Sequence, residues 1–196
     1  MTSRRAALVL GALLCALAQP AAAAMERYVI DPEHLSVAFM VNHLGYERLL
    51  GQFLKGAGSF ELDAEAEKLQ SIRVEIDADS VFTNHAERDR HLRSADFLSA
   101  REFPKITFTG TSFEKAGINR VRVTGELTLL GRKRPFTLEA TLNKLANYPI
   151  DHRRPTVGVS ARAKLKRSDF GMTYGADNGL VGDDIELIFE FEAVRR

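Results

Sequence analysis

The sequence has a single cysteine among its 196 residues, no tryptophan and almost no excess of charge. One cysteine cannot form an internal disulfide, so a scaffold held together by disulfide bonds is excluded. The 27 lysine and arginine residues balance 26 aspartate and glutamate residues, which argues against a nucleic-acid-binding protein. A hydrophobic fraction of 45% argues against a disordered chain. The length suits one domain with a sizeable core.

The only long apolar run lies at the start of the chain. Two arginines precede an apolar stretch, Ala6–Ala18, and small residues follow up to Ala24. This order is typical of a secretory signal peptide cleaved after Ala24, and the stretch is shorter than the ~20 residues of a membrane-spanning helix. We therefore expect residues 1–24 to direct export and to be removed together with the only cysteine, Cys15. An uncleaved anchor and lipidation at Cys15 are the alternatives, and the paired arginines also permit twin-arginine export.

After the leader, short segments alternate between apolar and polar residues with a period of two. Such alternation predicts β-strands that bury one face and solvate the other, as is usual in antiparallel sheets. The segments with this pattern or a strand-like composition are 28–30, 35–41, 49–54, 59–62, 72–76, 106–108, 121–129, 136–142, 157–165 and 185–191. Glycine-containing turns separate several of them. The prediction is one mainly all-β domain, residues 25–196, built as an antiparallel sandwich or a closed barrel.

One helix is expected to interrupt the strands. Asn84 stands three residues before Glu87, which fits an N-terminal capping box. A proline further on requires an extended residue before it, so we expect the helix to end near Leu98. Its charged residues fall four positions apart, as in Asp89 and Arg93, and such pairs stabilise a helix on its own. Its apolar residues would dock it against one end of the sheet structure.

The sequence contains no arrangement typical of a known catalytic or metal site. A G-x-S-x-G elbow, a P-loop and an H-E-x-x-H motif are all missing. On a helix, His85 and His91 would be six positions apart and point to different sides, unlike the i,i+4 pair of a zinc site. The inventory favours binding over catalysis, with no metal and no cofactor.

Seven stretches spread over residues 25–196 follow the pattern of a known family. They are YVID at 28–31, NHLGY at 42–46, GQF at 51–53, NHAERDRHLRSADFL at 84–98, FPKITF at 103–108, GELTLLG at 125–131 and RSDFG at 167–171. On these stretches the sequence resembles the YceI-like family of exported bacterial proteins, described as lipocalin-like polyisoprenoid binders. One departure is Leu35, which is inserted between His34 and Ser36. Because of this extra residue, the sequence does not decide which side chains of the first strand point to which face.

The resemblance implies an antiparallel, lipocalin-like β-barrel of about eight strands with one short helix covering an end. Its interior would hold an isoprenoid chain, such as a polyprenyl phosphate or a quinone tail. A barrel of ~8 strands is wide enough for one small ligand. Each methylene buried contributes ~0.8 kcal/mol, so a long tail can bind without a specific polar contact.

The candidate ligand-binding residues fall into three groups. The aromatic residues expected to line the lumen are Phe39, Phe53, Phe108 and Phe170, although ordinary core packing would look the same in sequence. The helix residues expected to meet a phosphate or quinone head are Arg88, Asp89 and His91, with a purely structural helix as the alternative. The residues expected to donate hydrogen bonds at the pocket mouth, unless they are structural, are His34 and His43.

The leading interpretation is a periplasmic binding or carrier protein for an isoprenoid lipid or quinone, without catalytic activity. Two other classes stay open because a barrel does not decide function. One is an enzyme that acts on an amphipathic substrate at the charged helix. The other is a stress-related structural protein whose lumen is only its core. Nucleic acid is not expected as a partner, whereas a transient membrane contact and a homodimer are left open.

Overall fold

The computed structural model describes residues 24–196, so the predicted signal peptide lies, apart from its last residue, outside the described part of the chain. Residues 24–196 form ten strands, one α-helix and two short 3-10 helices. The strands are β1 (Glu26–His43), β2 (Glu47–Phe53), β3 (Gly56–Asp63), β4 (Lys68–Asp77), β5 (Val81–Phe82), β6 (Lys105–Gly117), β7 (Arg120–Leu129), β8 (Arg132–Asn147), β9 (Pro155–Lys166) and β10 (Val181–Arg195). The helices are η1 (Ala78–Ser80), α1 (Ala86–Arg93) and η2 (Arg167–Phe170).

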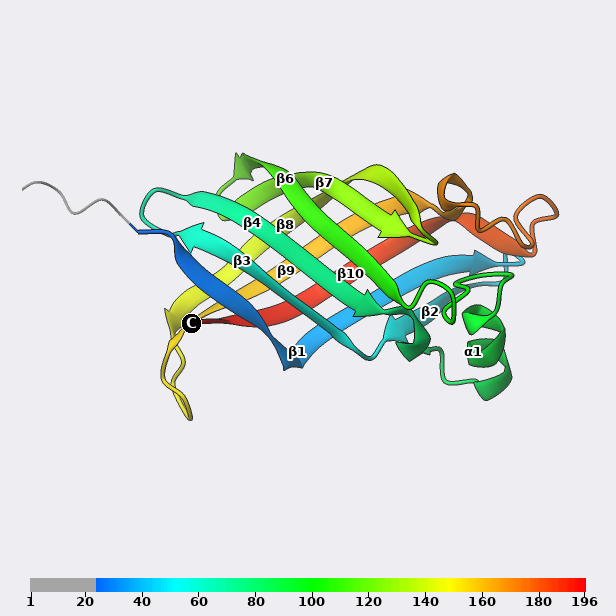
Figure 1. The fold of residues 1–196 in the computed structure, drawn as a ribbon, viewed down its shortest axis with the longest axis horizontal. Coiled ribbons are helices and arrows are strands. Elements are labelled where there is room, and N and C mark those ends of the chain that lie inside the picture. Colours follow the sequence, from blue (N-terminus) through cyan, green and yellow to red (C-terminus); the bar gives the residue numbers. More distant parts are fainter. Residues whose placement is uncertain (1–23) are drawn as a thin grey trace, which may run out of the picture.

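The strands close into an antiparallel barrel with α1 at one end (Figure 1). Around the ring the order is β10-β9-β8-β7-β6-β4-β3-β1, and β1 pairs with β10 to close it. The short strands β2 and β5 extend one wall, because β2 pairs with the second half of β1 and β5 pairs with β2. The predicted fold, an antiparallel barrel of about eight strands with one short helix, is confirmed.

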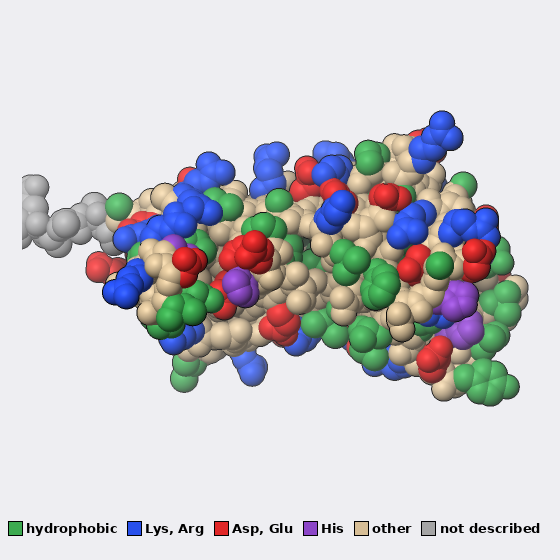
Figure 2. All heavy atoms as spheres, turned by 90° about the horizontal axis from the view of Figure 1, so that it is seen from below, with side chains coloured by type: hydrophobic (Ala, Val, Ile, Leu, Met, Phe, Trp, Pro, Cys, Tyr) green, Lys and Arg blue, Asp and Glu red, His purple; other side chains and the backbone are tan. Residues whose placement is uncertain are grey.

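Alternation along each strand sets which side chains face the interior. On β7, Val123 and Leu127 are 1% and 6% exposed, whereas the neighbouring Arg122 and Glu126 lie on the outer surface. Because successive side chains of a strand point to opposite faces, the period of two in the sequence becomes an apolar interior and a polar exterior. On the face seen in Figure 2, acidic and basic side chains are intermingled. No helix within residues 24–196 is long and apolar enough to cross a membrane.

The first strand contains the irregularity that the inserted Leu35 indicated. Ile30 lies opposite Ala193 and Leu35 lies opposite Phe191, so β1 advances five residues while β10 advances two. Extra residues of this kind form a bulge that changes which face a side chain takes. Ile30 and Leu35 therefore both line the interior, although their separation is odd.

The helix α1 is shorter than predicted, and its predicted cap was wrong. The N-cap is His85, whose ring Nδ1 accepts a hydrogen bond from the backbone N–H of Arg88 at 3.2 Å. Asn84 instead has a φ of 61°, a left-handed conformation that asparagine tolerates, so the chain turns there before the helix begins. The helix ends at Arg93 and not near Leu98, because the next residue is extended and turns follow.

Candidate functional site

The barrel encloses a cavity of about 710 Å³. Inward-facing side chains of all eight ring strands line it, and most of these side chains are apolar. The volume is within the ~300–1,000 Å³ typical of ligand pockets. The lining runs from the β6–β7 turn to the segment after α1, so the space extends along the barrel.

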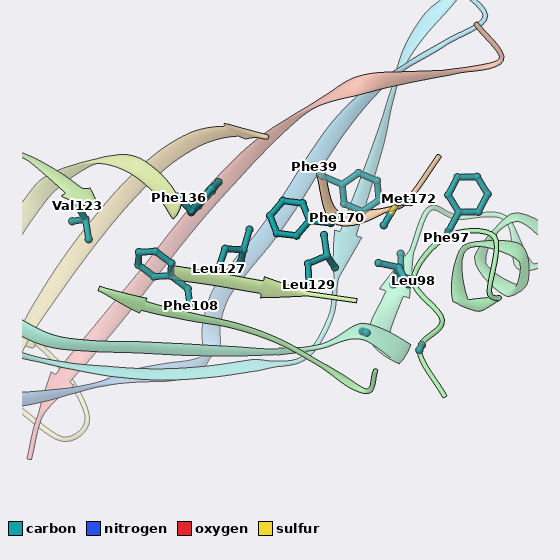
Figure 3. Packing of buried hydrophobic residues seen from close by; sticks show 13 residues of the cluster. Phe39, Phe97, Leu98, Phe108, Val123, Leu127, Leu129, Phe136, Phe170 and Met172 are labelled. Atoms are coloured by element: carbon teal, nitrogen blue, oxygen red, sulfur yellow. The ribbon is translucent and has the colours of Figure 1, made fainter. Parts of the chain in front are cut away.

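Three of the four predicted lumen phenylalanines line this cavity. They are Phe39, Phe53 and Phe108. Phe170 is not part of the lining; it is 3% exposed and packs in the buried cluster, beside Phe39 in Figure 3. Contact of these rings with a ligand stays a prediction.

Two glycines make room for the aromatic rings inside the barrel. A Cβ at Gly51 would come within 2.1 Å of the Phe39 ring, and a Cβ at Gly125 within 2.8 Å of the Phe108 ring. A larger side chain at Gly51 would require the Phe39 ring to move, and one at Gly125 would also meet the carbonyl oxygen of Thr109 at 2.2 Å. The two rings therefore pack directly against the backbone of a glycine.

The end of the cavity beside α1 is closed. Phe97 and Leu98, in the turns after α1, and Met172, after η2, are all buried and line this end (Figure 3). They supply the apolar contacts through which the α1 segment docks on the barrel. The expectation that a helix covers one end is therefore met by α1 together with the turns that follow it.

A buried arginine holds this closed end together. Arg167 is 1% exposed; its Nε donates a hydrogen bond to the carbonyl of Gly182 at 2.7 Å, and its terminal nitrogens donate to Met172 at 2.9 Å and Val181 at 2.7 Å. The guanidinium also lies 5.9 Å from the centre of the Phe97 ring. Burial lowers the pKa of Arg167 from its ordinary value. Its contacts join η2 and the segment after it to the first residues of β10.

The predicted head-group residues Arg88 and Asp89 lie on α1 and do not line the cavity. Asp89 is 5% exposed and accepts hydrogen bonds from the backbone N–H and the hydroxyl of Thr83, at 2.8 and 2.5 Å. Arg88 donates to the hydroxyl and the carbonyl of the same threonine, both at 2.7 Å. These contacts fix the chain between β5 and α1. The predicted pair of Asp89 with Arg93 was wrong, since Arg93 instead donates to carbonyls in η1 and β5.

His91, the third helix residue, also lies outside the cavity lining. Its Nε2 lies 2.9 Å from Oδ2 of Asp96, and its ring stands edge-on to the rings of Phe97 and Tyr174, each with centroids 5.0 Å away. His91 therefore joins α1 to the turns around it. A role of these helix residues in ligand binding stays a prediction.

The histidines of β1 lie outside the cavity lining. His34 is exposed, and the hydrogen bond between its Nδ1 and Oδ2 of Asp31, at 2.8 Å, raises the pKa of His34 above its ordinary value. His43 ends β1 and is half-buried. Within residues 24–196, no group of three or more His, Cys, Asp or Glu residues is arranged to hold a metal ion.

The cavity opens at the end opposite α1. The exposed lining residues of the described chain all lie on two hairpins, β3–β4 and β6–β7, whose turns lie toward that end (Figure 1). They are Ala64, Glu67, Lys68, Gln70, Lys115, Gly117, Asn119 and Arg120. We call this set the mouth.

The opening arises because β4 and β6 are paired along only part of their length. Their pairing runs over five residues, from Asp77 opposite Lys105 to Arg73 opposite Thr109. Just beyond this point both strands are irregular: β4 has Ser71 with a φ of 56°, and the pairing of β6 with β7 shifts register after Gly110. Bulges bend a strand and end its pairing.

Beyond this point, residues 68–72 of β4 and 110–117 of β6 face each other without pairing to each other. We call these two facing stretches the seam. One ion pair crosses between the two hairpins at this level, from Nζ of Lys115 to Oε2 of Glu67. Both side chains are about two-thirds exposed. The wall of the barrel is therefore held at the seam by side chains and not by a backbone ladder.

The sequence pattern of one domain family, described as the YceI-like domain, matches residues 28–193. The chain belongs to the YceI-like family. It is 42% identical over 176 residues to "Protein YceI" of Salmonella arizonae, and the match covers 89% of this chain and 90% of that protein. The resemblance seen in the sequence is thereby confirmed.

Solved structures show the same YceI-like barrel. The YCEI protein of Campylobacter jejuni is 30% identical, with a TM-score of 0.71 over 79% of this chain and 89% of that one. BcnA of Burkholderia cenocepacia, at 22% identity, has a TM-score of 0.73 over 83% of this chain and 98% of its own. A polyisoprenoid binding domain from Saccharophagus degradans, at 13% identity, has a TM-score of 0.64 over 88% and 100%. The last two comparisons concern the fold alone.

Sequence reasoning missed the charged residues that line this YceI-like cavity. Arg167 opens the RSDFG stretch, but a single arginine at a strand end looks like a surface residue. Lys68, Lys115 and Arg120 stand beside turns, where charged residues are common. The signal that could have found them is their position at the same end of neighbouring hairpins, which requires the strand order.

We expect Arg167→Met to lower the melting temperature by about 10 °C, because three buried carbonyls lose their donor at ~1–3 kcal/mol each and ~1 kcal/mol shifts a domain of this size by ~2–4 °C. Arg167→Lys keeps the charge but not the planar fork, so an intermediate loss is expected. Thermal unfolding followed by circular dichroism measures this. Arg162→Met, at an exposed ion pair on β9, is the control and should change little. An unchanged melting temperature in Arg167→Met would contradict the structural role.

Proposed function

We propose that this YceI-like protein is a periplasmic binding or carrier protein that holds one long isoprenoid chain in the barrel. The observation that carries the proposal is the cavity itself, which is apolar along the barrel, closed beside α1 and open at the mouth. A blind apolar tunnel suits a ligand with one long tail and one polar end. The predicted signal peptide supports the periplasm as the place of action.

Burial of the tail provides enough free energy for binding. Ten methylenes at ~0.8 kcal/mol each give about 8 kcal/mol, which corresponds to a micromolar dissociation constant before the cost of ordering the chain. Aromatic pairs inside the barrel, Phe39 with Phe53 and Phe108 with Phe136, have centroids 5.7 and 5.8 Å apart. They give a firm apolar wall that needs no polar partner from the tail.

The comparisons favour an isoprenoid among the long apolar chains. A structural neighbour of the same fold is described as a polyisoprenoid binding domain, and the chain shares its family with the curated YceI proteins. The lining also favours binding over catalysis, because in residues 24–196 its only carboxylate is Glu67 and it contains no histidine. A general acid and a general base facing each other are therefore missing from the described lining.

The test is mass spectrometry under non-denaturing conditions on protein purified from the periplasmic fraction of its native host. We expect one isoprenoid-type lipid per chain. After delipidation, the folded protein should take up one polyprenol, polyprenyl phosphate or isoprenoid quinone per chain. Delipidated protein with an intact β-sheet circular dichroism spectrum that takes up none of the three would overturn the proposal.

A further inference from the structure

The charged residues that line the cavity are mostly of one sign. Within residues 24–196 they are four cations and one carboxylate, namely Lys68, Lys115, Arg120, Arg167 and Glu67. The whole chain has nearly equal numbers of basic and acidic residues, and its outer face mixes them (Figure 2). The positive excess is thus a property of the lining and not of the composition.

Three of the four cations lie at the mouth. Lys68, Lys115 and Arg120 are exposed, on the two hairpins that border the seam. In the described part of the chain Lys68 and Arg120 form no ion pair, and Lys115 pairs with Glu67. The mouth therefore carries a net positive charge at the place where the polar end of a bound amphiphile would meet water.

The fourth cation is unsuited to hold a head group. Three carbonyls already accept hydrogen bonds from Arg167, and its side chain is 1% exposed at the closed end. A phosphate there would have to lose its water inside an apolar barrel, which is costly unless every charge is paired. The polar end belongs at the mouth, with the tail directed toward α1.

We propose that Lys68, Lys115 and Arg120 form a binding site for an anionic head group, so that the preferred ligand is a lipid phosphate and not a neutral lipid. This rests on the proposed function, since the tail must occupy the cavity. The planar guanidinium of Arg120 can donate two hydrogen bonds to a phosphate. Lys115 adds a point charge from the same hairpin, and Lys68 adds one from the β3–β4 hairpin. Glu67 competes with the phosphate for Lys115, and this competition favours release of the ligand.

Three probes separate the head group from the tail: a polyprenyl phosphate, the polyprenol of the same chain length, and inorganic phosphate. Delipidated wild-type protein should bind the polyprenyl phosphate at least about 10-fold more tightly than the polyprenol. Added salt should reduce this difference, because exposed charges are screened. Inorganic phosphate alone should not displace the polyprenyl phosphate, because it lacks the tail.

The decisive variant is Lys68→Gln/Arg120→Gln, which removes two exposed charges that have no ion-pair partner among residues 24–196. It should bind the polyprenyl phosphate about 10-fold more weakly and the polyprenol as wild type does. Lys55→Gln/Arg101→Gln is the matched control, with the same change of charge at exposed positions outside the lining. It should leave both affinities unchanged.

The outcomes separate the two proposals. An undiminished affinity of Lys68→Gln/Arg120→Gln for the polyprenyl phosphate, or an equal loss for both lipids, overturns the head-group site. A selective loss in Arg88→Ala would place the head at α1 and overturn it as well. If wild-type protein binds the polyprenol as tightly as the polyprenyl phosphate, only the head-group site is overturned, and the proposed function stands. Failure to bind either lipid or a quinone removes the proposed function itself.

Discussion

Ala140→Phe/Ala161→Phe should weaken the binding of a long polyprenyl chain by about 100-fold while the barrel stays folded. The two alanines lie opposite each other on β8 and β9, and both are buried and line the cavity. Two phenyl rings there would occupy space that the tail needs. Excluding three to four methylenes costs about 3 kcal/mol at ~0.8 kcal/mol each, which is the expected 100-fold.

A series of chain lengths measures this by titration calorimetry. Short chains that end before the new rings should bind the variant as they bind wild type, and only longer chains should lose affinity. Lys164→Phe, on the outer face of β9, is the matched control and should not change the dependence on chain length. If the double variant binds every chain length as wild type does, the tail does not lie in the barrel.

Linking the two sides of the seam should slow ligand uptake at least about 10-fold. Glu67→Cys/Lys115→Cys places one thiol on each hairpin at the ion pair that crosses the seam. A short bis-maleimide would join them, and the only native cysteine, Cys15, is absent from a chain that starts at Met25. We expect this effect because a long chain that enters beside the mouth, through the seam, parts the two hairpins, in the way that lids gate other sites.

The control for the link is Arg122→Cys/Glu139→Cys, treated in the same way. These residues are opposite each other on β7 and β8, which are already joined by a backbone ladder. Uptake by the linked control should match that of unlinked protein in stopped-flow fluorescence with a labelled lipid. Equal uptake by both linked proteins would mean that the ligand enters elsewhere.

The walls of the barrel could be predicted from the sequence because burial on one face of a strand is a local pattern. Val123 and Leu127 alternate with Arg122 and Glu126, and this alone places the first pair inside. The bulge at Leu35 was also visible in the sequence as an extra residue. The sequence did not reveal that Ile30 and Leu35 would both point into the barrel.

The site was less accessible to sequence reasoning because it depends on contacts between distant segments. Lys68 and Arg120 line the same end of the cavity because the β3–β4 and β6–β7 hairpins are neighbours in the sheet, through β4 and β6. The cap of α1 was missed for a similar reason. Asn84 can cap a helix or turn the chain, and the hydrogen bonds of Asp89 to Thr83 accompany the second conformation in the structure.

The seam gives a closed barrel two short strand edges. Along 68–72 and 110–117 the facing backbone groups of β4 and β6 take part in no ladder with each other, so parting them breaks the Glu67–Lys115 pair but no backbone hydrogen bond between these strands. Local opening there is less costly than unfolding a wall, and ligand exchange can proceed while the rest of the barrel stays intact. Unpaired edges also invite pairing with another chain, and lysines at such edges oppose it. Lys68 and Lys115 thus protect the opening against edge-to-edge association.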